Sequence, residues 1–166
     1  MVTTPRLRLE PLLPDHADAM FEGLRDPRLY AFTPDEPPVS RAALRARYER
    51  LATRRSPDGS QQWLNWAVAD RRDGAYLGYL QATIREDGGA AVAYVLFHDA
   101  WGEGYAREAL RAVLDELAER YGCRDADASV EPDNARSIAV LEALGFVADG
   151  RDEDGLRYRK ALGRRT

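Results

Sequence analysis

A glycine-rich segment between two regular patterns is the part of the sequence best suited to chemistry. Trp101-Gly102-Glu103-Gly104-Tyr105-Ala106-Arg107-Glu108-Ala109 separates the apolar run 91–97 from the helical pattern 105–121. Small residues at the start of a helix leave backbone N–H groups uncovered at the positive end of the helix dipole. Such groups bind phosphate or pyrophosphate. The segment therefore predicts a site for a phosphorylated ligand.

Three interpretations of the Gly102-x-Gly104 turn compete. The first is a tight strand-to-helix connection without a ligand. The second is a dinucleotide-binding turn, for which Asp125 lies at a suitable distance for a ribose contact, but Arg107 stands where that motif needs a small residue. That fold also needs repeated parallel units, and only one is expected here. The third, an acyl-coenzyme A site, depends on the motifs described below.

The elements that position this turn follow from periodicity and turn residues. We expect helices over residues 14–24, 40–55, 105–121 and 134–144, and strands over residues 6–12, 63–70, 76–85, 91–97, 125–130, 146–151 and 156–162. Residues 29–39 contain three prolines and are expected to form a loop, and residues 163–166 are expected to be frayed.

The connections between these strands predict the sheet. Asp-Gly pairs separate the strands expected between residues 63 and 97, which indicates an antiparallel meander. The strand, helix and strand between residues 91 and 130 require a parallel pair. The expected fold class is therefore α/β (α+β mixed), with a mostly antiparallel sheet of about seven strands, a central parallel pair and about four helices.

Composition narrows the class of protein. The chain has 166 residues, 45% of them hydrophobic, and a formal net charge of −4. This length predicts a single domain covering residues 1–166. The negative field repels nucleic acid and anionic membranes, so neither is an expected partner, and an amine fits better. The lone Cys123 and two histidines are too few for a disulfide or a metal site, so no metal is expected.

The first 20 residues carry several charges and so cannot form the apolar region of a signal peptide. No apolar run approaches the roughly 20 residues that cross a bilayer. We therefore expect a cytoplasmic protein.

The glycine-rich segment resembles a known motif. Trp101-Gly102-Glu103-Gly104-Tyr105-Ala106 is similar to motif A of the GNAT acetyltransferase superfamily, usually written Q/R-x-x-G-x-G/A, with Trp101 in place of the first Gln or Arg. The wording Trp-Gly-x-Gly-Tyr-Ala-x-Glu-Ala resembles the branch that contains the N-terminal acetyltransferases of ribosomal proteins. A second block, from Asn134-Ala135-Arg136-Ser137 to Leu144-Gly145-Phe146, resembles the N-x-x-S…L-x-x-L-G-F signature of that branch. The resemblance covers nearly the whole chain.

The resemblance implies how acetyl-CoA, as co-substrate, is held. The pyrophosphate would lie on the turn, and the pantetheine arm would pair with a strand edge and contact the second block. The residues implied are Gly102, Glu103, Gly104, Tyr105, Ala106 and Arg107 in the turn, Val95, Leu96 and Phe97 at the strand edge, and Asn134 and Ser137 in the second block. Asn134 is alternatively only a helix cap, and Ser137 only a helix-interior serine. Arg107, Arg111 or Arg136 could meet the 3′-phosphate, or each is a solvated helix residue.

The catalytic positions of the family are not filled as usual. Leu141 stands where many relatives have a tyrosine acid, and Ala91 where many have a glutamate. Glu131 and Tyr94 are candidate replacements, and His98 and Glu103 are further ones, each with a purely structural alternative. The backbone N–H of Leu96 is the implied donor to the oxyanion.

An enzyme without a strong general base depends on the fraction of the acceptor amine that is already neutral. An α-amine with a pKa of about 7.7 to 8.0 is roughly 10% neutral at pH 7, whereas a lysine amine with a pKa of about 10.4 is less than about 0.1% neutral. An enzyme without a strong base should therefore acetylate an α-amine or a small-molecule amine more readily than lysine. The acidic loop residues Asp35 and Glu36 are candidates for attracting that ammonium group, or are solvated.

The sequence thus predicts an N-acetyltransferase that moves an acetyl group from acetyl-CoA to a primary amine by direct attack in a ternary complex. Acceptors include a protein or peptide N-terminus and a small-molecule amine. The alternative is a non-catalytic acyl-CoA-binding or regulatory module, which the missing acid and base positions keep open. Relatives are often dimers, so the resemblance also allows a homodimer.

Overall fold

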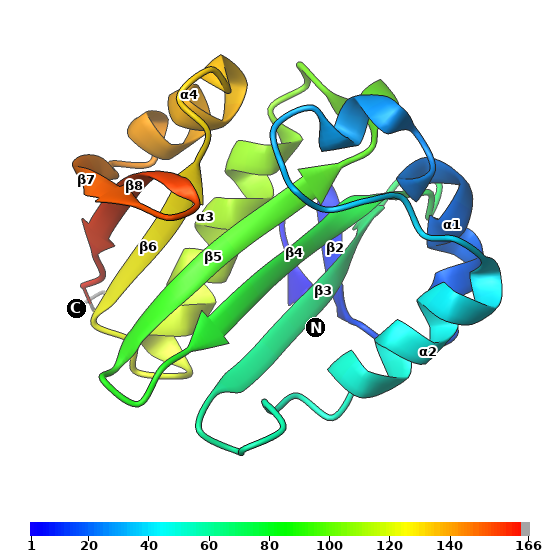
Figure 1. Cartoon of the computed structure of the whole chain (residues 1–166), viewed down its shortest axis with the longest axis horizontal. Coiled ribbons are helices and arrows are strands. Elements are labelled where there is room, and N and C mark those ends of the chain that lie inside the picture. The colour runs from blue at the N-terminus through cyan, green and yellow to red at the C-terminus, as the bar shows by residue number, and fades with distance from the viewer. Residues whose placement is uncertain (164–166) are drawn as a thin grey trace.

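The computed structural model describes residues 1–163 and contains one large sheet with helices packed against both faces (Figure 1). The elements, in chain order, are β1 (Val2–Thr3), β2 (Leu7–Pro11), α1 (His16–Leu24), η1 (Pro27–Tyr30), α2 (Arg41–Leu51), β3 (Gln62–Asp70), β4 (Tyr76–Ile84), β5 (Gly89–Leu96), η2 (His98–Ala100), α3 (Tyr105–Glu119), β6 (Asp125–Val130), α4 (Ala135–Ala143), β7 (Val147–Asp152) and β8 (Gly155–Ala161).

Within residues 1–163 the sheet has the order β1-β2-β3-β4-β5-β6-β8-β7, and only β5 and β6 pair in parallel there. The predicted mixed sheet with a central parallel pair and four α-helices is confirmed. The strand count differs, since eight strands are present within residues 1–163 instead of about seven. The additional strand, β1, has two residues that pair with Arg8 and Leu9, and so short a segment carries no periodic pattern.

Several element boundaries differ from the sequence prediction. Helix α2 ends at Leu51 rather than near residue 55, because Arg54 takes a left-handed φ of 62° and Arg55 forms an isolated bridge to Gln62. The expected loop 29–39 begins inside the short helix η1. The fraying expected at residues 164–166 lies outside the described residues.

Two hydrophobic clusters hold the helices on opposite faces of the sheet. Because strand side chains alternate, Leu80 packs with α3, whereas its neighbour Tyr79 packs with α1 and α2. The buried residues of α3 include Leu110, Val113 and Leu117, all with no exposed surface. Helix α3 is thus fixed against the centre of the sheet, and with it the turn that precedes it. Within residues 1–163, no helix is both long and apolar enough to cross a membrane.

Truncation of the α3 anchor should be costly. We expect Leu110→Ala to lower the free energy of unfolding by about 2–5 kcal/mol, because it removes a fully buried side chain and leaves a cavity. Leu13→Ala, at a leucine that is 55% exposed, should change it by less than about 0.5 kcal/mol. Urea denaturation of the three proteins measures both, and equal losses would contradict this account of the core.

Candidate functional site

The two parallel strands pair over only part of their length. The β5–β6 register contains Gly89↔Asp125, Ala90↔Ala126 and Ala91↔Asp127 and goes no further. Beyond Ala91 the strands diverge (Figure 1), so one edge of β5 has no neighbouring strand. We call the space between them the wedge. The ladder between β4 and β5 continues to Leu96 without a register shift.

Backbone alternation decides which residues of β5 face the wedge. Phe97 donates its N–H to the carbonyl of Leu77 on the β4 side, at 2.7 Å. In an antiparallel ladder the next residue directs its N–H and C=O to the opposite edge. The Leu96 carbonyl indeed accepts a hydrogen bond from Trp101 Nε1, at 2.9 Å, instead of from β4. Leu96 therefore presents its amide to the wedge, whereas Val95 and Phe97 direct theirs to β4.

The turn before α3 keeps its amides open. Gly102 and Gly104 both have a φ of 78°, a left-handed conformation that favours glycine. Gly104 caps α3 without a side-chain hydrogen bond. Among the described residues, none accepts a hydrogen bond from the N–H groups of residues 102–107. These six donors lie at the positive end of a 15-residue helix, which suits an anionic ligand.

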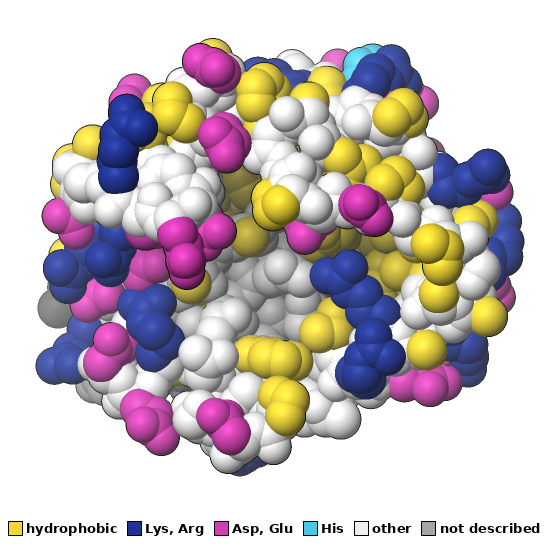
Figure 2. Space-filling model, viewed as in Figure 1, with side chains coloured by type: hydrophobic (Ala, Val, Ile, Leu, Met, Phe, Trp, Pro, Cys, Tyr) yellow, Lys and Arg dark blue, Asp and Glu magenta, His cyan; other side chains and the backbone are white. Residues whose placement is uncertain are grey.

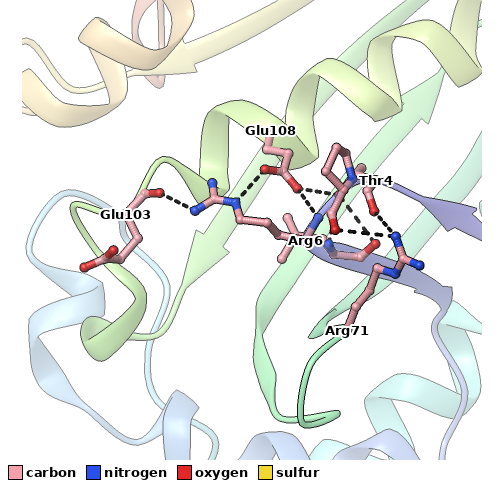
Figure 3. A network of polar contacts seen from close by, with 7 residues as sticks. Thr4, Arg6, Arg71, Glu103 and Glu108 are labelled. Carbon is pink, nitrogen blue, oxygen red and sulfur yellow. Dashed lines mark hydrogen bonds and ion pairs between the residues drawn. The ribbon is translucent and has the colours of Figure 1, made fainter.

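A polar network ties this turn to the N-terminal segment (Figure 3). Arg6 donates to the Glu103 carbonyl at 2.9 Å and to Glu108 Oε1 at 2.8 Å, and its guanidinium lies 4.4 Å from the centre of the Tyr105 ring. Thr4 donates to the same Glu108 carboxylate, at 2.5 Å. The network fixes the carbonyl side of the turn and leaves its N–H side free. Sequence patterns did not indicate this network, because its partners lie about 100 residues apart.

Helix α4 forms the second wall of the wedge. Asn134 Oδ1 accepts the Ser137 N–H at 3.3 Å, so Asn134 does act as a helix cap. The Ser137 hydroxyl lies 3.0 Å from the Tyr94 hydroxyl, which joins α4 to β5. Burial raises the pKa of Tyr94, partly opposed by the Ser137 hydrogen bond and the charge of Arg136. Tyr94 is therefore a neutral phenol at pH 7, able to donate a proton.

The other candidate residues are on α3, on α4 and just beyond β6. Arg136 places its guanidinium carbon 3.3 Å from the centre of the Trp101 ring, next to the turn. Arg107 and Arg111 are exposed on α3. Glu131 is exposed just beyond β6, and its carbonyl accepts the Asn134 N–H at 2.9 Å.

Two further positions singled out from the sequence make contacts within the fold. His98 Nε2 lies 3.1 Å from Arg28 Nη1, and its ring packs on Trp101. Leu141, where many relatives have the acid, is only 3% exposed within the core. Among residues 1–163, no three His, Cys, Asp or Glu side chains gather to hold a metal ion.

A pocket opens on the other face of the sheet, under α1 and α2 (Figure 2). Its volume is about 250 Å³, and its lining includes Asp35, Glu36, Arg47, Tyr48 and Tyr79. Asp35 and Glu36 are the two loop residues that the sequence indicated as candidates for attracting an ammonium group. The sequence did not indicate the other three, because they reach the pocket only when α2 packs over the sheet.

Comparison with known proteins identifies the class. The family model described as acetyltransferase (GNAT) domain matches residues 6–147, most of the 166-residue chain. The chain therefore belongs to the GNAT acetyltransferase family.

Individual proteins share limited sequence identity with this chain. An uncharacterized N-acetyltransferase of Bacillus licheniformis, p20, is 36% identical over 80 residues, which cover 48% of this chain and 43% of that protein. The chain thus spans less than half the length of that relative. The ribosomal L7/L12 α-N-protein acetyltransferase, solved with coenzyme A, has a TM-score of 0.82 at 18% identity, covering 96% of each chain. The ribosomal-protein-S5-alanine acetyltransferase of Vibrio fischeri has a TM-score of 0.80 at 18% identity, covering 96% of this chain and 95% of that one. At such identities these two structures show the shared fold.

The Glu108 network should make stability depend on pH. Burial alone would raise the pKa of Glu108, but hydrogen bonds from Thr4 and Arg6 outweigh it, so the pKa lies below its ordinary value. A lowered folded-state pKa stabilises the fold fully above the unfolded pKa of about 4.3, and this stabilisation is lost as pH falls through the folded-state pKa. We expect Glu108→Gln to cost about 1–2 kcal/mol at pH 7 and much less at pH 3.

Denaturation curves at both pH values, with Glu119→Gln on the same helix as the control, measure this difference. A loss that is the same at pH 7 and pH 3 would contradict the role assigned to the Glu108 carboxylate.

Proposed function

We propose that this chain is an acetyl-CoA-dependent N-acetyltransferase in which a primary amine attacks the thioester directly. The observation that carries the proposal is the open row of N–H groups at residues 102–107 beside the unpaired edge of β5. A row of open N–H groups can bind a diphosphate. An unpaired strand edge can pair with the amides of an extended ligand. Coenzyme A carries both groups, and membership of the GNAT family supports the same ligand.

Different residues would bind different parts of coenzyme A. The N–H groups of Gly102 to Arg107 would bind the pyrophosphate, and Arg136, beside that turn, is the best placed of the three candidate arginines for a phosphate. The Leu96 edge, Asn134 and Ser137 would line the pantetheine arm. Bound there, acetyl-CoA supplies the acetyl thioester that the acceptor attacks.

The chemistry needs an oxyanion donor and two proton movements. The Leu96 N–H, directed into the wedge, would stabilise the oxyanion. As the C–N bond forms and the C–S bond breaks, the thiolate takes a proton, which the neutral Tyr94 phenol can donate. A thiol with a pKa of about 8.5 leaves without a strong acid, so the leucine at position 141 is tolerable. Cys123, buried in the core, is unsuited to a covalent intermediate.

The amine must lose its proton as well. Glu131 is exposed close to the α4 side of the wedge and could accept it directly or through a water. We propose further that residues 1–166 act as one domain and that the acceptor enters by the pocket under α1 and α2, where Asp35 and Glu36 lie.

A second candidate function is acyl-CoA binding without turnover. The observation that favours it is the absence of the usual side chains at positions 91 and 141, which are Ala91 and Leu141. Tyr94 and Glu131 must replace them if the chain is an enzyme.

Binding and turnover separate the two functions. We expect calorimetry to detect coenzyme A binding and thiol release from acetyl-CoA to depend on an added amine. Gly104→Val should weaken binding at least tenfold, because a branched side chain cannot take the left-handed φ without shifting the turn. Gly122→Val, at a similar φ beyond the other end of α3, imposes comparable strain away from the site and should leave affinity unchanged.

If coenzyme A does not bind, or binds both variants equally, the cofactor site is wrong. If it binds and no amine promotes thiol release, the chain is a binding module.

The absence of a strong base predicts the kind of amine. At pH 7 we expect kcat/KM for an α-amine to exceed that for a lysine side chain at least tenfold, because far more of the α-amine is neutral. The matched pair consists of two forms of one lysine-containing peptide. In the first the N-terminus is acetylated and the lysine side chain is free, and in the second the N-terminus is free and the lysine side chain is blocked. Raising the pH to 9 should narrow the difference. Comparable rates at pH 7 would show that the enzyme deprotonates lysine itself.

A further inference from the structure

The pocket under α1 and α2 lies one strand away from the reactive edge of β5. Tyr79 and Gln81 of β4 line it, and they pair with Val95 and Ala93 of β5. Neighbouring strands are about 4.8 Å apart, so a ligand that extends from the far edge of β5 across β4 and towards α2 spans roughly 10 Å.

One buried polar atom in this pocket is without a partner. The Tyr48 side chain lines the cavity and is 4% exposed, and its hydroxyl makes no hydrogen bond with any described residue. Buried polar groups in folded proteins are nearly always paired, so an orphan hydroxyl next to a cavity indicates a partner that the chain does not supply. A bound ligand that accepts a hydrogen bond is such a partner.

Arg47 adds a positive charge at the same place. Two other arginines of α2 have partners, since Arg41 pairs with Glu22 and Arg45 with Asp15 and Glu49, whereas Arg50 lines the pocket beside Arg47 and adds to its positive charge. Arg47 forms no ion pair with any residue between 1 and 163, yet its charge acts on the Tyr48 and Tyr79 hydroxyls. Burial raises the pKa of both tyrosines, that of Tyr79 to about 12, and Arg47 partly opposes the rise. Both phenols are thus hydrogen-bond donors beside a guanidinium.

The opposite rim carries the opposite charge. Asp35 and Glu36, in the loop between η1 and α2, line the same pocket, and no described residue forms an ion pair with either carboxylate. Figure 2 shows the hollow with basic side chains on the α2 side and acidic ones on the side of this loop. A ligand with one charge would leave one of these rims unmatched.

We infer that the acceptor is a short peptide-like amine that carries a carboxylate several bonds from its α-amino group. Arg47 and Tyr48 bind the carboxylate, and Asp35 and Glu36 attract the ammonium on its way to the wedge. Guanidinium and phenol together form charge-assisted hydrogen bonds to one carboxylate. This inference rests on the proposed acetyltransferase function and names its substrate class.

The span of the pocket sets the spacing of the two charges. An extended chain covers about 3.3–3.6 Å per residue, so a tripeptide bridges roughly 10 Å between its amino and carboxyl ends. In a free amino acid the two groups are too close to reach both places. The suitable probes are therefore alanyl-glycyl-glycine and its C-terminal amide, which share one amine and differ only in the charge at the far end, with alanine and alaninamide as the short pair.

The experiment compares acid and amide probes on four proteins by thiol release from acetyl-CoA. For the wild type, we expect kcat/KM to favour the tripeptide acid over its amide by about 10- to 100-fold, mostly through KM. The alanine and alaninamide pair should show no such preference. Arg47→Gln should abolish the preference by slowing the reaction of the tripeptide acid much more than that of its amide. Tyr48→Phe should reduce the preference several-fold. Arg45→Gln, whose partners lie outside the pocket, should keep it.

Equal rates with acid and amide in the wild type would overturn the inference, as would an equal loss with both probes in Arg47→Gln. Thermal denaturation of Tyr48→Phe shows whether that variant is folded, and Arg47→Gln decides the matter if it is not. Turnover without an acid preference leaves the acetyltransferase proposal intact. Failure of every amine, or of coenzyme A binding by calorimetry, overturns that proposal and the inference with it.

Discussion

The separation of β5 from β6 is the constraint on which the rest of the molecule depends. Two parallel strands that pair at Gly89, Ala90 and Ala91 and then diverge must leave backbone donors and acceptors without a strand partner. In a protein interior such groups need hydrogen bonds from elsewhere. Trp101 satisfies one of them by donating to the Leu96 carbonyl. The proposed binding site is thus the part of the sheet where β5 has no neighbouring strand.

The elements around the wedge hold it open from both sides. Helix α3 is anchored by fully buried residues, and its first turn is tied to the N-terminal segment by Arg6 and Glu108. Helix α4 is joined to β5 by the contact between Ser137 and Tyr94. Both helices are thus held by contacts within the chain itself. A site of this kind is preorganised, so binding should cost little ordering of the chain.

Local signals predicted most of the fold, and long-range geometry explains what they missed. Asp-Gly turns and alternating runs placed the meander, and the Gly102-x-Gly104 turn placed the open amides. The resemblance implies Val95, Leu96 and Phe97 together, and sequence alone cannot tell that only the Leu96 amide is directed away from β4. The end of α2 at Leu51 depends on a left-handed Arg54, which no propensity indicates. Arg47 and Tyr48 acquire their setting only when α2 lies over the sheet.

Trp101 occupies the motif position at which the superfamily usually has Gln or Arg. Its side chain links β5 to α4. Its indole binds the Leu96 carbonyl of β5 and stacks under Arg136 of α4. Any shift of α4 relative to β5 must therefore change the surroundings of an indole ring. Once Trp63 and Trp66 are replaced, the emission of Trp101 alone would report on the wedge without an attached dye.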